Sequence, residues 1–299
     1  MADLLRRRPP GPAALRAKLD QARSTGEPLV LPGVYDALGA RLVERAGFDA
    51  VYMTGFGATA SLLGRPDVGL LGLTEMVDNA RRIVAATDLP VLADADTGYG
   101  NQINVIRTVQ EYERAGVAGI HLEDQILPKK CGHLDNKEVV DIETMVGKVR
   151  AAVAARTDPD LVIVARTDSR ASHGLDDAIE RARRCADAGA DVLFVEALEG
   201  TDELARVAAD LADVPLLFNW AEGGKTPPLS YAEVADLGFA VIIMPIGTLL
   251  AATAAMQQFL ARLKADGTPA AFVDELVPFG AFTELIGLPE IEDLERRFA

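Results

Sequence analysis

Four segments of the chain repeat one pattern of apolar and polar positions. Each starts with helical periodicity, passes through a glycine and continues into a short apolar run, and the segments read ERAGFDAVYMTG, ERAGVAGIHLED, ADAGADVLFVEA and ADLGFAVIIMP. A glycine at this place suits the left-handed conformation that ends many helices. The glycines are Gly47, Gly116, Gly189 and Gly238. The pattern therefore predicts a helix followed by a strand, four times over.

Further apolar runs lie between these repeats: PLVLPG, LPVLADAD, LVIVARTD and VPLLFNWAEGG. Both sets together give eight candidate strands, nearly continuous in hydrophobicity, as parallel strands buried on both faces are. Helical patterns at 105–114, 143–156 and 175–188 separate some of them. Eight strands alternating with helices over about 250 residues predict an α/β fold of the (β/α)₈ or TIM-barrel type.

A doubly wound open sheet is the alternative, but no glycine-rich dinucleotide fingerprint follows the first strand. No low-complexity linker divides the 299 residues, so we expect one domain, with the barrel at about 28–247 and a helical segment at 248–299. This C-terminal segment carries Phe259, Phe272, Phe279 and Phe282. These four aromatic side chains give the segment more apolar surface than a single terminal helix usually needs. We therefore expect the segment to form an oligomer contact.

The net negative charge of the chain argues against nucleic acid as a partner. There are 45 acidic and 30 basic residues, a formal net charge of -15, and the negative field of such a chain repels nucleic acid.

Two cysteines build no disulfide framework and no secretory signal is visible, so we expect a cytoplasmic protein. Residues 240–260 are apolar, but Pro245 and Gly247 interrupt them. Strand, turn and helix fit this stretch better than a membrane span, and we expect no membrane partner.

Polar residues gather where the predicted strands end. In a parallel barrel the loops after the strands converge at one face, and function sits there. The residues are Tyr52, Thr54, Asp94, Asp96, His121, Glu123, Arg166, Asp168, Glu196 and Asn219. We expect them to surround one site.

Asp94 and Asp96 are two residues apart, so both carboxylates lie on one side of a strand end. Carboxylates that leave room for water and substrate oxygens suit Mg²⁺. The alternative is that one aspartate caps a helix and the other is solvated. Glu123, Glu196 and Asp67 favour the metal, because so many acids at converging ends repel one another without a cation.

The segment PKKCGH at 128–133 places two lysines, a thiol and an imidazole in a loop after the fourth strand. Lys130 and His133 beside Cys131 favour thiolate character and a proton donor or acceptor. Burial as a small hydrophobe is the alternative, and we expect that environment for Cys185 instead.

Arg166 suits a substrate carboxylate, because guanidinium binds carboxylate through two parallel hydrogen bonds. A structural ion pair with Asp168 or Glu196 is the alternative. Gly98 and Gly100 either let backbone amides approach an anion or form a plain turn.

Five motifs, in this order and spacing, resemble the isocitrate lyase/phosphoenolpyruvate mutase superfamily: DADTGYGN, GIHLEDQ, PKKCGH, ARTDS and FNWAEGGKTP. The resemblance covers roughly residues 30–245 and is strongest to the branch that holds 2-methylisocitrate lyase, 2,3-dimethylmalate lyase, the petal death protein and carboxyvinyl-carboxyphosphonate phosphorylmutase. It implies a barrel whose last helix is swapped between subunits, a homotetramer built as a dimer of dimers, and a keto- or hydroxy-acid substrate. It also implies Mg²⁺, with Mn²⁺ as a substitute.

The resemblance also implies roles for single residues. Asp94 and Asp96 would hold the metal, with Asp67 and Glu123 in its outer shell. The implied catalytic residues are Cys131 as general acid on a gating loop, Tyr52 as base, and His121, Lys129 and His133 beside them. The implied substrate contacts are Thr54, Gly55, Phe56, Gly132, Arg166, Glu196 and Asn219.

Two departures from the family pattern narrow the expected substrate. Thr54 and Phe56 replace the serine and glycine usual in 2-methylisocitrate lyase, and Leu249 and Leu250 stand where tricarboxylate lyases have an arginine. A tricarboxylate would lack its counter-charge. We therefore expect a Mg²⁺-dependent carbon–carbon lyase that cleaves a small, malate-like 2-hydroxy diacid to a keto acid and a second carboxylic acid. The alternatives are a carboxyphosphonate-type mutase and an oxaloacetate hydrolase or decarboxylase.

Overall fold

Eight parallel strands form the centre of the molecule in the computed structural model, which describes residues 5, 11–132 and 136–299. The strands are β1 (Leu29–Val34), β2 (Val51–Met53), β3 (Val91–Asp94), β4 (Gly119–Glu123), β5 (Val162–Thr167), β6 (Val192–Val195), β7 (Leu217–Asn219) and β8 (Val241–Met244). Their order is β6-β5-β4-β3-β2-β1-β8-β7. A parallel bridge between Leu193 and Leu216 joins the two outer strands. The sheet therefore closes, and the predicted barrel is confirmed.

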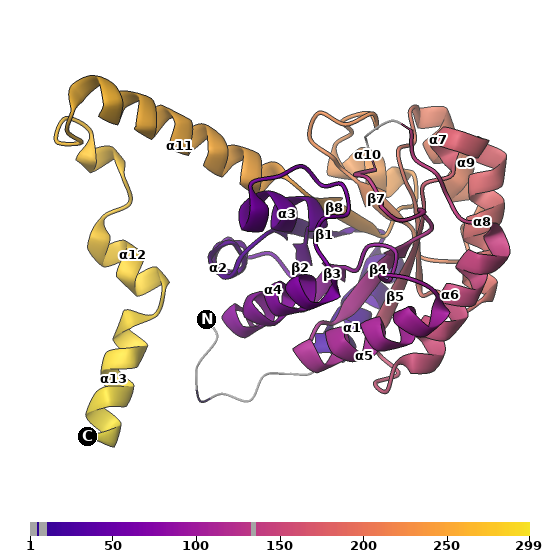
Figure 1. Ribbon diagram of the computed structural model, residues 1–299, viewed down its shortest axis with the longest axis horizontal. Helices are drawn as coiled ribbons and strands as arrows, with labels where there is room; N and C mark the ends of the chain where they lie inside the picture. The colour runs from indigo at the N-terminus through magenta and orange to yellow at the C-terminus, as the bar shows by residue number, and fades with distance from the viewer. Residues whose placement is uncertain (1–4, 6–10, 133–135) are drawn as a thin grey trace.

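Helices follow the strands and surround them (Figure 1). They are α1 (Gly11–Thr25), α2 (Ala37–Arg45), α3 (Gly55–Leu63), α4 (Leu73–Ala86), α5 (Gln102–Ala115), α6 (Ile142–Ala155), α7 (Arg170–His173), α8 (Leu175–Asp187), α9 (Thr201–Asp210), α10 (Tyr231–Asp236), α11 (Gly247–Asp266), η1 (Val273–Glu275), α12 (Phe279–Leu285) and α13 (Leu288–Phe298). The four repeated glycines all have positive φ, between +85° and +102°. Each lies where a helix ends before a strand, as predicted.

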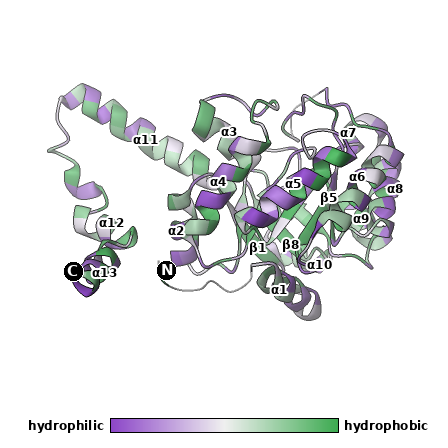
Figure 2. Cartoon of the chain, turned by 60° about the horizontal axis from the view of Figure 1, so that its bottom comes forward, coloured by the Kyte–Doolittle hydropathy of each residue, from purple (hydrophilic) through white to green (hydrophobic). Residues whose placement is uncertain are grey.

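The apolar core has two parts. One lies between the strands and the surrounding helices, which carry both polar and apolar residues (Figure 2). The other lies inside the barrel, where Leu15 and Leu19 of α1 pack against Leu31, Leu92 and Val164 of the strands. Helix α1 therefore closes the N-terminal end of the barrel with aliphatic side chains, and the opposite end is left for polar groups.

The C-terminal helices project away from the barrel (Figure 1). Helix α11 has no buried residue, and Met256, Leu260 and Phe279 are 55%, 59% and 83% exposed. Strand β8 and helix α11 confirm the prediction of strand, turn and helix for 240–260. Within the part of the chain that the structure describes, no helix is both long and apolar enough to cross a membrane. The oligomer contact expected of this segment stays a prediction.

Candidate active site

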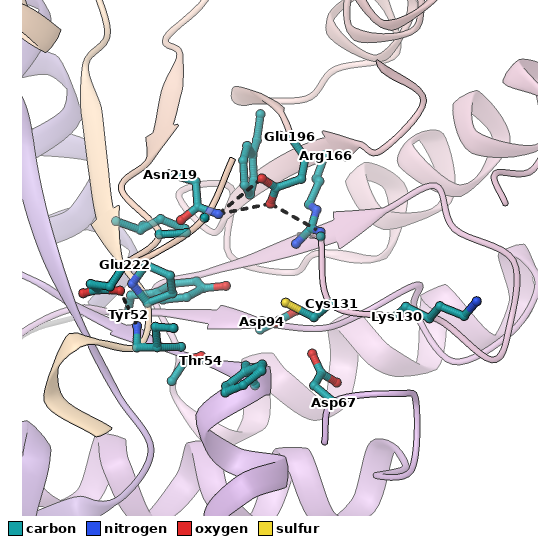
Figure 3. A pocket seen from close by; sticks show the side chains of 18 of the residues that line it. Tyr52, Thr54, Asp67, Asp94, Lys130, Cys131, Arg166, Glu196, Asn219 and Glu222 are labelled. Atoms are coloured by element: carbon teal, nitrogen blue, oxygen red, sulfur yellow. Dashed lines mark hydrogen bonds and ion pairs between the residues drawn. The ribbon is translucent and has the colours of Figure 1, made fainter. Parts of the chain in front are cut away.

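A cavity of about 200 Å³ opens where the strands end (Figure 3). Most of the predicted site residues line it: Tyr52, Thr54, Phe56, Asp67, Asp94, Lys129, Cys131, Gly132, Arg166, Glu196 and Asn219. A cavity below the few hundred Å³ that drug-sized ligands fill suits a small acid. The chain thus brings together residues that are as far apart as 52 and 219 in the sequence.

Four other predicted residues lie behind the wall of this cavity, namely Gly55, Asp96, His121 and Glu123. Each contacts a residue that lines it. For example, Nδ1 of His121 lies 3.1 Å from the hydroxyl oxygen of Tyr52. His133 lies outside the described residues.

A tight turn after β3 arranges the two central aspartates. Asp96 has a φ of +48°, in the left-handed region that aspartate tolerates better than most residues. Its amide donates to Oδ1 of Asp94 at 3.0 Å, and the amide of Gly55, at the start of α3, donates to Oδ2 at 3.2 Å. Both aspartates are buried. Backbone amides from the turn after β3 and from the start of α3 therefore hold the Asp94 carboxylate in place.

Lys129 changes the charge argument made from the sequence. Its ammonium group is buried and lies 2.8 Å from Oδ2 of Asp67 and 2.6 Å from Oδ1 of Asp96. The crowded acids are thus partly neutralised by the chain itself, and repulsion among them does not alone require a metal. Among the described residues, seven carboxylates are buried against five cations, so a deficit of positive charge remains. The cations are Lys129, Lys137, Lys148, Arg166 and Arg181.

The ionisation of the site reflects this deficit. Burial raises the pKa of Asp96 to about 7, with Asp94, Asp67 and Glu123 adding to the rise and Lys129 opposing it. Burial and the charge of Asp94 also raise the pKa of Tyr52 well above its usual value. Without a further cation, these two groups hold their protons more tightly than the same groups do in water.

The donor set fits a hard divalent cation. Oε1 of Glu123 is buried and accepts no hydrogen bond from the described residues. In the same part of the chain, no group of three or more His, Cys, Asp or Glu residues is arranged to hold a metal ion by itself. One or two carboxylates, completed by water and substrate oxygens, are the usual protein ligands of Mg²⁺. Asp94 and Asp96 offer this arrangement.

Arg166 forms the structural ion pair that the sequence left open as an alternative, and its role toward a substrate carboxylate stays a prediction. Its Nε and Nη2 atoms each donate to Asp168 at 2.9 Å, so the structural ion pair is present. The guanidinium also lines the cavity, with Nη1 3.3 Å from Glu123 and Nη2 3.4 Å from Glu196. Asn219 donates to both oxygens of Glu196, at 3.3 and 3.1 Å (Figure 3). A network of charges therefore fixes one wall of the cavity.

Cys131 lines the cavity and is half-buried, so the alternative of a fully buried thiol is not realised. Its amide donates to the carbonyl of Asp67 at 3.1 Å. One residue earlier, Lys130 exchanges two hydrogen bonds with the side chain of Gln125, of 2.8 and 2.9 Å. Cys185 is 3% exposed, as predicted, and burial raises its pKa to about 12.

Two residues that line the cavity, Phe194 and Glu222, were not predicted from the sequence. Phe194 lines the cavity two residues before Glu196, and the two-residue period of a strand places both side chains on one side. The two-residue spacing from Glu196 could therefore have predicted Phe194 as a site residue. Glu222 also lines the cavity, but only as part of a loop whose path the sequence does not indicate. Gly98 and Gly100 do not line it, in line with the plain turn.

Comparison with known proteins shows the family to which the chain belongs. The family profile described as phosphoenolpyruvate phosphomutase matches residues 19–264. A 2,3-dimethylmalate lyase of Eubacterium barkeri is 49% identical over 283 residues, which are 95% of this chain and 98% of that protein.

Solved structures give the same result. Oxaloacetate acetylhydrolase in complex with 3,3-difluorooxalacetate matches with a TM-score of 0.90 and 42% identity, over 97% of this chain and 98% of that one. Phosphonopyruvate hydrolase in complex with oxalate and Mg²⁺ matches with a TM-score of 0.87 and 32% identity, over 96% and 99%. The resemblance predicted from the five motifs is confirmed, and the chain belongs to the phosphoenolpyruvate phosphomutase family, within the isocitrate lyase superfamily.

Proposed function

We propose that this enzyme is a Mg²⁺-dependent lyase that cleaves the C2–C3 bond of a small, substituted malate-like diacid. The observation that carries the proposal is that a half-buried thiol, a guanidinium and a buried aspartate face one cavity of about 200 Å³. Cleavage of this bond leaves a carbanion, and the site must stabilise and then protonate it. Cys131, Arg166 and Asp94 supply the groups for that chemistry.

Asp94 and Asp96 would hold the metal, with Asp67 and Glu123 in its outer shell. The bound ion, Mg²⁺ or Mn²⁺ in its place, would polarise the forming carbonyl and stabilise negative charge on it. Arg166 would bind a substrate carboxylate, and Asp168 would hold its guanidinium plane in the required orientation. Thr54, Phe56 and the Glu196–Asn219 pair would orient the rest of the substrate, while the amide of Gly55 holds Asp94 in place.

Tyr52 would take the proton of the substrate hydroxyl. Its raised pKa keeps the phenol protonated in the resting site, so it acts as a base only if its own proton leaves at the same time. Nδ1 of His121, 3.1 Å from the phenol oxygen, is placed to receive that proton. We therefore propose Tyr52 and His121 as a two-residue proton path.

As the C2–C3 bond breaks, its electron pair remains on C3 and gives an enolate-type fragment, while C2 becomes the carbonyl of a keto acid. Cys131 would donate its proton to C3 and release the second carboxylic acid. Lys129 stays protonated, because four nearby carboxylates outweigh the opposing effect of its burial on its pKa. Its charge would hold Asp67 and Asp96 in place.

The cavity supports a small substrate. Phe56 lines it and takes up space, whereas Leu249 and Leu250 do not line it and bring no positive charge. Among the described residues, the cations that line the cavity are Arg166, Lys129 and Lys130. The first two already have buried acidic partners, and the ammonium group of Lys130 donates to the carbonyl of Asn136. A dicarboxylate therefore fits better than a tricarboxylate.

Hydrolysis of oxaloacetate is the second candidate function, favoured by the similarity to oxaloacetate acetylhydrolase. The same metal and arginine would stabilise the enolate that leaves in that reaction. A phosphonomutase reaction is a third, supported by similarity to a carboxyvinyl-carboxyphosphonate phosphorylmutase at 41% identity.

One experiment separates these functions. The protein is incubated with Mg²⁺ and a panel of substituted malates, oxaloacetate and phosphonopyruvate, and products are followed by proton and phosphorus NMR. A keto acid released from a malate derivative supports the lyase; oxalate and acetate from oxaloacetate, or a shifted phosphorus resonance, would replace it with the corresponding alternative. EDTA abolishes turnover if a metal is required, and full activity in EDTA contradicts the metal assignment.

We further propose a cytoplasmic homotetramer in which the segment 248–299 forms the contact between subunits. The exposed apolar side chains of this segment, Phe279 above all, support the proposal. Analytical ultracentrifugation should give four times the chain mass of 31.8 kDa. A monomer at micromolar concentration contradicts it.

A further inference from the structure

Lys137 is a buried cation for which the mechanism above has no role. It lies six residues after Cys131, and its side chain is 1% exposed. Its ammonium group donates to Oδ1 of Asp168 at 2.8 Å and to the carbonyl oxygen of Gly132. A buried lysine is costly unless it is paired, and here both of its partners belong to the neighbourhood of the active site.

Asp168 joins this lysine to Arg166. One carboxylate accepts two hydrogen bonds from the guanidinium and a third from Lys137, and it is fully buried. Burial alone would raise the pKa of Asp168, but the two cations overcome it and hold the pKa well below its usual range. The carboxylate is thus a permanently charged link between the wall of the cavity and the loop that carries Cys131.

Gly132 completes the link from the other side. A Cβ atom at this position would collide with Nη2 of Arg166, and it would lie 2.6 Å from Oε2 of Glu196. The backbone next to Cys131 therefore packs directly on the guanidinium. Its carbonyl bonds to Lys137, whose other partner, Asp168, is also the main partner of that guanidinium.

We propose that Lys137 is a positioning residue that sets the Cys131 thiol relative to Arg166 through the shared carboxylate of Asp168. The lysine touches no substrate. Its effect is to give the proton donor and the carboxylate-binding group one common anchor, so that neither moves without the other. This inference deepens the proposed function, since it rests on Cys131 as the proton donor and Arg166 as the carboxylate clamp.

The test uses Lys137→Met, which keeps the aliphatic stem and removes the charge. Alkylation of each cysteine by iodoacetamide is followed by mass spectrometry in the full-length protein without substrate. We expect Cys131 to react about tenfold faster in the variant, because a hydrogen bond to a charged group is lost. Cys185, 3% exposed on α8, should keep its wild-type rate and so reports global unfolding.

Turnover gives the second readout. In Lys137→Met we expect kcat to fall by about 30-fold and KM to rise by only about threefold, because misplacement of a reacting group costs mainly in the transition state. Lys137→Arg should restore part of kcat. Lys18→Met, which removes a lysine of α1 whose partner is Asp49, is the matched control and should behave as wild type.

The outcomes separate the two proposals. Faster alkylation of Cys131 alone supports the anchoring role even if no malate derivative is cleaved, and in that case only the proposed function fails. Wild-type alkylation and wild-type kcat in folded Lys137→Met overturn the inference. Equal acceleration at Cys131 and Cys185 overturns it too, because the lysine is then only a general stabiliser of the fold.

Discussion

The two ends of the barrel are built from the same eight strands but filled in opposite ways. At the N-terminal end, Leu15 and Leu19 of α1 pack onto aliphatic side chains from the strands. At the C-terminal end, buried carboxylates surround Lys129 and Arg166 and leave a cavity. The apolar end gains stability from packing, whereas the buried charges of the polar end are costly unless the chain or a bound cation balances them. Changes at the two ends should therefore affect different properties.

The largest effect is expected at the polar end, from Cys131→Ser. Serine keeps the size of the side chain but is a much weaker acid, and loss of a general acid costs about 10³-fold in kcat. The free energy of unfolding should stay near wild type, since the thiol is half-buried and little packing is lost. Steady-state kinetics and urea unfolding measure both, and near-normal turnover would remove Cys131 from the mechanism.

The apolar end should respond the other way to Leu15→Ala. Leu15 is 1% exposed, and a cavity in such a core costs about 3 kcal/mol of unfolding free energy. Activity of the folded variant should be unchanged, because α1 lies at the far end from the site. Ile103→Ala, at a position 71% exposed, is the control and should change neither property. A large loss of kcat in Leu15→Ala would mean that the two ends are coupled.

Arg166→Lys tests whether the polar end needs geometry as well as charge. Lysine keeps a positive charge among Glu123, Asp168 and Glu196, so the protein should still fold. It cannot form two parallel hydrogen bonds with a carboxylate. We expect kcat/KM to fall by about 30-fold, equivalent to about 2 kcal/mol. An unchanged KM for the diacid would argue against a carboxylate clamp.

The buried charges of the polar end should also make the free energy of unfolding depend on pH at acidic pH. The pKa of Asp168 is lowered in the folded state by Arg166 and Lys137, against the effect of burial, and the unfolded value is about 3.9. Its contribution to stability is therefore present above about pH 4 and is lost as the pH falls through the folded pKa. We expect the slope of unfolding free energy against pH below about pH 4 to be smaller in Asp168→Asn. Asp49→Asn, at an aspartate whose side chain is 69% exposed, should keep the wild-type slope.

The apolar features of the molecule were the easier ones to predict. The β-branched runs and the four glycines gave all eight strands, because burial on both faces leaves an uninterrupted apolar signal. The polar strand ends likewise gave most of the residues that line the cavity. A strand end is adjacent in sequence to its apolar run, so its place in the barrel follows from local pattern.

The pair of Arg166 with Asp168 was open to prediction, because the two residues are neighbours on one strand end, but the partners of the buried lysines were not. Nothing local indicates that Lys129 lies between Asp67 and Asp96, or that Lys137 reaches Asp168, 31 residues away. These pairings depend on how a loop folds back over the barrel, and loop paths carry no periodic signal. The charge of the acids was visible in the sequence, but it was not visible which lysines partly balance that charge.

The smallest expected effect comes from two helix caps, of which one lines the cavity and the other does not. Thr54 caps α3 by accepting from the amide of Gly57 at 3.2 Å, and Asp36 caps α2 by accepting from Gly39 at 2.7 Å. Replacing either by alanine removes one cap and should cost about 1 kcal/mol of unfolding free energy.

Only Thr54 also lines the cavity. Thr54→Ala should therefore raise KM for the diacid as well, whereas Asp36→Ala should leave KM at the wild-type value. Urea unfolding together with steady-state kinetics on the pair checks this. Equal changes of KM in both variants would show that helix stability alone, and not contact with the substrate, connects Thr54 to the site.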